Sequence, residues 1–169
     1  MNKSCLENQI ADYVIQYKEN IYCLAFSYVK NADDALDIVQ ESIYKALSSK
    51  DSLKNPNYIK TWFYRIVVNA SLDFLRKKRK LDVVDSEIFS SLDHGVIDDY
   101  ENVDLQKALD NLPSNYRTII ILRYFEDLKI DEIAEILNEN INTIKSRLYK
   151  SLKILRIKMN DSEEVYYER

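Results

Sequence analysis

The near absence of glycine and proline restricts the possible folds most strongly, because the 169-residue chain holds one glycine and two prolines. Tight hairpins and phosphate-cradling loops need backbone angles that glycine adopts most readily. The sequence therefore argues against hairpin-rich β-sandwiches, Rossmann-type folds and P-loops. No segment alternates apolar and polar residues over a sustained length, whereas apolar residues recur three and four positions apart. We expect an all-α protein.

Residues that commonly carry catalysis or hold metals are scarce. His94 is the one histidine, so a multi-histidine metal site cannot form and no nucleophile–base pair is visible. Cys5 and Cys23 are too few for a disulfide scaffold or a four-thiolate zinc site, and we expect Cys23 to be a buried thiol. The sequence therefore predicts no catalytic residues, no metal, no cofactor and no enzymatic activity.

Hydropathy gives no sign of a membrane segment. No apolar run approaches the roughly 20 residues that a spanning helix needs, and the N-terminus lacks the apolar core of a signal peptide. We expect a cytoplasmic protein without direct membrane insertion.

Charge is segregated along the chain, although the net charge is only −4. Residues 60–80 contain seven basic residues and one acid, and residues 141–158 contain six basic residues and no acid. Residues 82–104 contain eight acids and no Lys or Arg. Two cationic segments separated by an acidic one indicate two anion-binding surfaces, although either segment alone could be an ordinary solvated helix face.

Residues 81–100 show no sustained helical period and are strongly acidic. We therefore expect two small helical domains joined by a flexible linker, the second domain a helix-turn-helix. The expected bounds are an N-terminal domain over 1–80, an acidic linker over 81–100, a C-terminal domain over 101–160 and a tail over 161–169.

In the first domain, periodicity predicts a helical pattern over Leu6–Val29, as two helices broken near Glu19 and Asn20. It also predicts a helix over 31–48 with Asn31 as its N-cap. A loop follows to residue 57. The next helix, over 58–80, interleaves aromatic rings with cations. Rings can stack on unpaired bases while cations follow the phosphates, although at helical spacing most of the rings must also be core.

The most specific segment is residues 129–150. Helices are expected over Ile130–Leu137 and Asn142–Met159, joined by a turn in which Ile141 points inward, as in a helix-turn-helix. Its outward face can bond to phosphates and base edges in a major groove, although an ordinary helical hairpin with a basic face is the alternative. That face presents Thr143, Lys145, Ser146, Arg147, Tyr149 and Lys150.

Three blocks in this order resemble bacterial RNA polymerase sigma factors of the extracytoplasmic-function (ECF) group, in the sigma-70 family. Residues 31–47 resemble the helix that docks on the clamp helices of the polymerase. Residues 59–80 resemble the region that melts and reads the −10 promoter element. Residues 109–156 resemble the domain that binds the −35 element and the polymerase flap.

The resemblance implies a sigma factor that initiates transcription, often in a stress response, with core RNA polymerase and promoter DNA as partners. It also implies an anti-sigma partner, often membrane-anchored, and capture of a flipped −10 base. The polymerase-facing residues would be Asp34, Asp37, Gln40 and Glu41. The −10 residues would be Leu53, Lys54 and Asn55 in the base-capture loop, Lys60, Trp62, Arg65 and Asn69 beside the opened strand, and Arg76, Lys77, Lys78, Arg79 and Lys80 on upstream phosphates. The −35 residues would be the outward face listed above, with Thr143 on phosphate.

Two positions depart from the family pattern. Lys129 replaces the usual Ser or Thr, so the expected N-cap is missing, and Asn138 replaces the usual Gly, although Asn tolerates the left-handed conformation. Two other readings stay open: a helix-turn-helix regulator that is not a polymerase subunit, and a helical adaptor that binds only proteins. The regulator would not need the acidic helix over 31–47 or the aromatic and cationic helix over 58–80.

Overall fold

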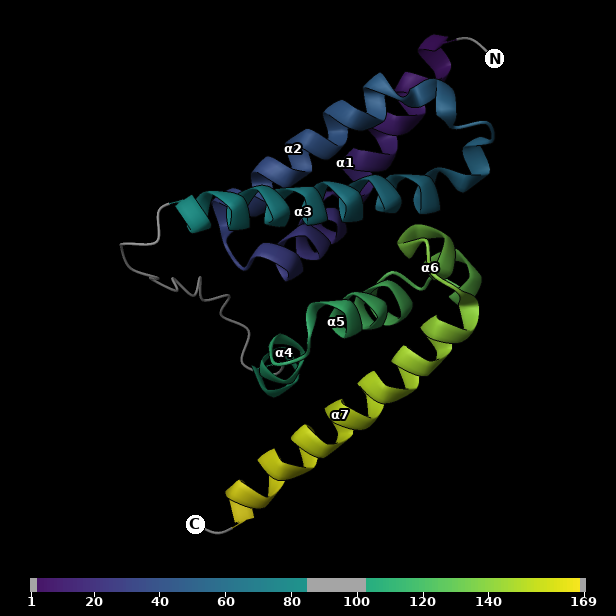
Figure 1. Ribbon diagram of the computed structural model, residues 1–169. Coiled ribbons are helices and arrows are strands. Elements are labelled where there is room, and N and C mark those ends of the chain that lie inside the picture. The colour runs from purple at the N-terminus through teal and green to yellow at the C-terminus, as the bar shows by residue number, and fades with distance from the viewer. Residues whose placement is uncertain (1–2, 85–102, 168–169) are drawn as a thin grey trace. The chain divides into compact units, whose positions relative to one another are not determined.

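The computed structural model describes residues 3–84 and 103–167, and every regular element in these ranges is helical (Figure 1). The chain divides into two compact units, one containing α1–α3 and the other containing α4, α5, α7 and most of α6. The expected all-α fold with two helical domains is confirmed. The acidic linker expected over 81–100 lies outside the described residues apart from 81–84, which continue α3.

The first unit is a three-helix assembly of α1 (Lys3–Val29), α2 (Ala32–Ser48) and α3 (Ile59–Val84), in which each helix contacts the other two. Its core consists of apolar residues that recur at helical spacing. Two buried serines in this core satisfy their hydroxyls within their own helices, Ser42 on the Ile38 carbonyl and Ser71 on the Val67 carbonyl. Residues that are fully buried include Ile21, Leu24, Ile38, Phe63 and Val67.

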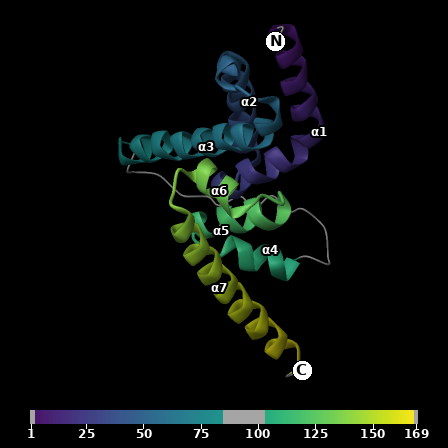
Figure 2. The ribbon, with the colours of Figure 1, turned by 90° about the vertical axis from the view of Figure 1, so that its right-hand side faces the viewer.

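The first helix bends at Tyr17, where φ is −112° and ψ is 18° (Figure 2). The break therefore lies two residues before the expected position, and the chain is helical on both sides of it. The ring centroids of Tyr17 and Tyr13 are 4.8 Å apart, and those of Tyr13 and Phe63 of α3 are 5.7 Å apart. The prediction for Cys23 was wrong: its neighbours Leu24 and Ala25 face the core, and Cys23 lies on the exposed side.

Local capping explains where α2 begins. The side chain of Asn31 accepts a hydrogen bond from the Asp34 amide at 3.0 Å, as predicted for an N-cap. Between α2 and α3 the chain forms two short 3₁₀ turns, η1 (Lys50–Ser52) and η2 (Pro56–Tyr58). They join helices that pack side by side, so the loop lies close to both.

The second unit consists of α4 (Val103–Asp110), α5 (Ser114–Ile120), a π-helical turn η3 (Ile121–Phe125), α6 (Ile130–Leu137) and α7 (Ile141–Tyr167). Helix α7 contacts both α4 and α5. One core cluster comprises Ala108, Leu109, Leu112, Ile120 and Leu155, with Tyr116 and Leu148 packed against it.

The side chain of Arg117 caps the C-terminal end of α4. Its guanidinium donates to the carbonyls of Leu109, Asp110 and Leu112 at 2.9, 2.9 and 2.8 Å. The last carbonyls of a helix have no partner within the helix, so this single side chain satisfies acceptors that the short α4–α5 turn would otherwise leave to solvent.

Three local features fix the start of α6 and the turn between α6 and α7. The Glu132 carboxylate accepts from the Lys129 amide at 2.7 Å, which is one half of a capping box and compensates for the missing Ser or Thr. Asn138 adopts the left-handed conformation with φ 51°, as expected. The Asn140 side chain accepts from the Asn142 amide at 2.8 Å, so α7 begins at Ile141.

Two expectations about α7 were wrong. Ile141 is 44% exposed and does not point inward, because it is the first residue of the helix rather than part of the turn. Helix α7 also continues to Tyr167, through seven residues where a tail was expected. The predicted bounds of α6 agree with the structure.

Candidate nucleic-acid interface

The inner side of α7 is fixed by packing. Ile144, Ser151 and Leu155 are buried, and they recur at the spacing of one helix face. Over residues 141–157 the opposite side of α7 is therefore the side that can meet a partner. Of the residues predicted there, Lys145, Ser146, Tyr149 and Lys150 are exposed, and Thr143 and Arg147 are half-buried.

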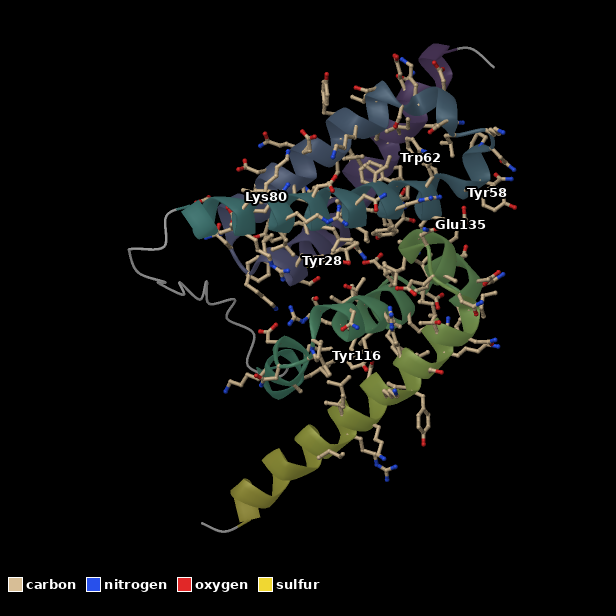
Figure 3. All side chains as sticks on the ribbon, in the orientation of Figure 1. Tyr28, Tyr58, Trp62, Lys80, Tyr116 and Glu135 are labelled. Carbon is tan, nitrogen blue, oxygen red and sulfur yellow. The ribbon has the colours of Figure 1, made fainter. Side chains whose placement is uncertain are left out.

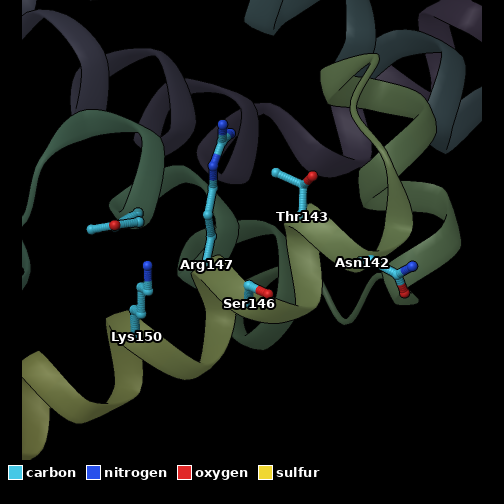
Figure 4. Close-up of a pocket in the computed structure, with 6 residues that line it drawn as sticks. Asn142, Thr143, Ser146, Arg147 and Lys150 are labelled. Atoms are coloured by element: carbon cyan, nitrogen blue, oxygen red, sulfur yellow. The ribbon is translucent and has the colours of Figure 1, made fainter.

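The structure divides this predicted set into two flanks. Thr143, Ser146, Arg147 and Lys150 line an open hollow of about 380 Å³ (Figure 4), together with Asn142 and Tyr116. Lys145 and Tyr149, four residues apart, do not line the hollow, and Tyr149 is 72% exposed. Tyr116 of α5 was missed by sequence reasoning, since nothing in the local sequence indicates which part of α7 it packs beside.

An ion pair holds one residue of the hollow. The Arg147 guanidinium donates to the Glu139 carboxylate at 2.9 Å, which ties the second turn of α7 to the preceding turn. Side-chain exposures of 29% and 36% mean that water still reaches both groups. The pair therefore orients Arg147 without removing it from the surface.

The exposed face of α3 supplies the second predicted surface. Arg65 and Asn69 are exposed, four residues apart, and the same face continues through Leu72 to Arg76. Trp62 is half-buried, and its indole N–H donates to the Ser52 hydroxyl at 3.0 Å. Tyr58 and Trp62 lie toward one end of α3 and Lys80 lies toward the other (Figure 3). Lys60, also predicted here, is half-buried.

The loop before α3 is held at several points. Lys50 pairs with Glu7 of α1, and the Asn55 side chain accepts from the Asn57 amide at 3.0 Å. Leu53, predicted as a residue of the base-capture loop, is only 5% exposed and packs the loop against the unit. Lys54 and Asn55 are exposed.

The basic end of α3 is partly paired within the protein. Lys78 contacts Asp34 of α2 at 2.8 Å, and Arg76 contacts Asp73 at 2.9 Å. Lys77, Arg79 and Lys80, the other predicted phosphate contacts, are exposed. Two of the five basic residues are thus bound to carboxylates.

The predicted polymerase-facing residues share the outer face of α2. Asp37, Gln40 and Glu41 are exposed, and Asp34 is half-buried by its contact with Lys78. Two apolar side chains lie on the same outer face, Leu36 at 49% and Tyr44 at 69% exposure. Leu47, in the last turn of α2, is 40% exposed. Sequence reasoning recognised the acids but missed these apolar neighbours.

Within the described ranges, no cluster of three or more His, Cys, Asp or Glu side chains could hold a metal ion. None of the helices searched there is long and apolar enough to cross a membrane.

Comparison with known proteins gives a consistent result for both units. Residues 13–81 match the family described as sigma-70 region 2, and residues 102–155 match sigma-70 region 4. The chain is 56% identical over 150 residues to the RNA polymerase sigma factor SigV of Bacillus subtilis, covering 89% of this chain and 90% of that protein. It is 32% identical to the ECF RNA polymerase sigma factor SigW of the same organism, covering 92% and 91% of the two chains.

A solved structure gives the same result. The sigma factor RpoE of Bartonella quintana, solved in complex with the anti-sigma factor NepR, is similar with a TM-score of 0.76 and 25% identity, covering 89% of this chain and 96% of that one.

Proposed function

Because this chain belongs to the ECF group of the sigma-70 family of bacterial RNA polymerase sigma factors, we propose that it reads a −35 duplex with α7 and opens a −10 element with α3 and the preceding loop. The observation that carries this proposal is the presence of both family regions on one chain, each with a cationic, solvent-facing helix. A regulator that only binds duplex DNA would not need the first of them.

The −35 contact is proposed for the outward side of α7. Lys145, Ser146 and Tyr149 are exposed, and side chains of these types can bond to base edges in the major groove. Thr143, Arg147 and Lys150 complete the surface. The ion pair between Arg147 and Glu139 supports the proposal because it fixes one cation before DNA arrives.

The −10 contact is proposed for the loop and the exposed face of α3. Lys54 and Asn55 are the remaining candidates for capture of a flipped base, since Leu53 is buried. Trp62, Arg65 and Asn69 would lie along the opened strand, with Lys60 beside them, as aromatic and polar side chains do in single-strand binding. The proposed upstream phosphate contacts are Arg76, Lys77, Lys78, Arg79 and Lys80.

The outer face of α2 is the proposed polymerase contact. Asp37, Gln40 and Glu41 offer acceptors around the exposed side chains of Leu36 and Tyr44. An interface commonly combines an apolar centre with a polar rim, and this face has both. An anti-sigma factor is a further proposed partner, because the similar RpoE structure was solved with one.

Run-off transcription with purified core polymerase tests the function. Genomic fragments from the source organism are transcribed with and without the full chain. Discrete new starts that need the protein are the expected result, and their aligned upstream sequences would define both promoter elements. If no new start appears and the protein does not co-elute with core polymerase, the proposed function is wrong.

A further inference from the structure

We propose that the hollow between α5 and the first turns of α7 binds one backbone phosphodiester of duplex DNA, through Lys150, Arg147 and the hydroxyl of Tyr116. The inference rests on the proposed reading of a duplex by α7. It adds a contact from α5 and divides the predicted recognition residues into backbone contacts and base contacts.

The lining of the hollow suits a phosphodiester. Two cationic side chains, two aliphatic hydroxyls, a carboxamide and a phenol line it, and no carboxylate does. A phosphodiester carries one negative charge and offers only acceptors, so it needs a surface of this kind. Base edges present mixtures of donors and acceptors, and a volume of about 380 Å³ open to solvent leaves room for a phosphate and its adjoining sugars.

The hydrogen-bond donors in the hollow differ in whether they already have a partner within the protein. Arg147 is already held by Glu139. Among the residues that the structure describes, neither the Lys150 ammonium nor the Tyr116 hydroxyl has a hydrogen-bond or ion-pair partner. These two groups are therefore available to an anion.

Tyr116 is well placed to act as a rigid donor. Tyr116 packs against the cluster of Leu112, Ile120 and Leu155, which fixes the residue, and it also lines the hollow. A donor that is already oriented loses little conformational freedom when it binds. Contacts of this kind to phosphates fix the register of a protein on a duplex and carry no sequence information.

The positions of the α7 side chains relative to the hollow support the same division. Thr143 and Arg147 are half-buried in the wall of the hollow, whereas Lys145 and Tyr149 are exposed on the other flank of the helix. When the helix lies in a groove, the wall residues face the backbone at the groove edge. Lys145 and Tyr149, which do not line the hollow, are then left to read bases.

The test uses the full chain and two fluorescent duplexes, one carrying the mapped −35 element and one of scrambled sequence, at several salt concentrations. Lys150→Gln should lower the slope of log K against log salt by about 1 and weaken both duplexes by the same factor. Lys107→Gln, the same change at an exposed position of α4, is the matched control and should leave the slope unchanged.

Tyr116→Phe removes only the hydroxyl and keeps the packed ring. It should weaken binding about tenfold on both duplexes, because a hydrogen bond to a charged acceptor is lost. Tyr124→Phe, at a residue 56% exposed on η3, is its control. Thermal unfolding followed by circular dichroism checks that Tyr116→Phe folds, and Lys150→Gln tests the proposal independently of packing.

Neutral methylphosphonates placed singly along the −35 duplex identify the phosphate. A methylphosphonate at one position should weaken binding by the unaltered chain. The same methylphosphonate should not weaken binding by the Lys150→Gln variant any further. Inorganic phosphate should compete no better than chloride at equal ionic strength, and stronger competition would instead assign the hollow to free phosphate.

A loss confined to one sequence would overturn the proposal in favour of base reading, and an unchanged salt slope would also overturn it. So would failure of the unaltered chain to bind any duplex at the lowest salt. Run-off transcription judges the proposed sigma function separately, so the two failures can be told apart.

Discussion

The two cationic surfaces differ in the location of the carboxylates with which their cations form ion pairs. At the basic end of α3, Lys78 reaches across to Asp34, which belongs to the outer face of α2. In the second unit, Arg147 pairs with Glu139 inside the same helix-turn-helix segment. One ion pair therefore joins the surfaces proposed for two different partners, and the other stays within one proposed surface.

This difference has a consequence for binding. A polymerase that contacts Asp34 competes with Lys78 for the carboxylate, and DNA that contacts Lys78 competes with Asp34. Each partner would release the group that the other needs, which couples polymerase binding to DNA binding. On α7, Lys145 and Lys150 have no such internal partner among the described residues, so that surface can bind a duplex directly.

The largest expected effect comes from removing two cations from each surface. Lys145→Gln with Lys150→Gln should weaken binding of the full chain to a scrambled duplex about a hundredfold, since both lysines are free. Arg76→Gln with Lys78→Gln should cost only about fivefold, because Asp73 and Asp34 already offset those charges. Fluorescence anisotropy measures both, and equal losses would remove the contrast between the surfaces.

Arg117→Met should destabilise the second unit by about 2 kcal/mol, because three carbonyls lose their charged donor. Trp62, the one tryptophan, lies in the first unit and reports on it alone. In urea, the transition followed by circular dichroism should gain an earlier component while the fluorescence transition of Trp62 stays in place. A fluorescence transition that moves equally would show that the units do not unfold separately, and Lys107→Met is the control.

Asp34→Asn should raise the affinity of the free chain for single-stranded DNA about threefold, since it releases Lys78 from a partly exposed ion pair. Asp37→Asn makes the same change of charge one turn away, at an exposed position outside the pair, and should have a smaller effect. If the two variants bind DNA equally, general charge and not the ion pair sets the affinity.

The smallest expected effect concerns the loop. Glu7→Lys alone should reduce the discrimination of the holoenzyme among bases at the captured −10 position about twofold, because an ion pair that positions η1 is lost. Adding Lys50→Glu restores the opposite charges and should restore the discrimination. Open-complex yields on promoters that differ at that base measure it. A double variant no better than the single one would count against positioning by this pair.

Local features of the structure could be predicted from sequence. The Asn31 cap, the left-handed Asn138 and the bounds of α6 depend on neighbouring residues, and the structure agrees with all three. Periodicity failed where a face was ambiguous. Cys23 is a small residue at a position whose orientation is set by how α1, α2 and α3 pack, and it was expected to be buried although it is exposed.

Contacts between elements could not be predicted. Two ion pairs, Lys78 with Asp34 and Lys50 with Glu7, join residues more than forty positions apart in the sequence. Tyr116 lines the hollow because α5 packs on α7. Charge patterning located both cationic segments, but it contains no information on which charges neutralise one another.

Permanganate probing of the reconstituted holoenzyme on a promoter mapped by run-off transcription tests the central claim most directly, that one chain opens DNA with its first unit and reads duplex with its second. We predict reactive thymines at the −10 element together with nuclease protection at the −35 element. Replacing Lys145 and Lys150 should abolish the protection at −35, and replacing Trp62 and Arg65 should abolish the reactivity at −10. Protection at −35 without any opening at −10 by the unaltered protein would contradict the claim and leave a duplex-binding regulator in its place.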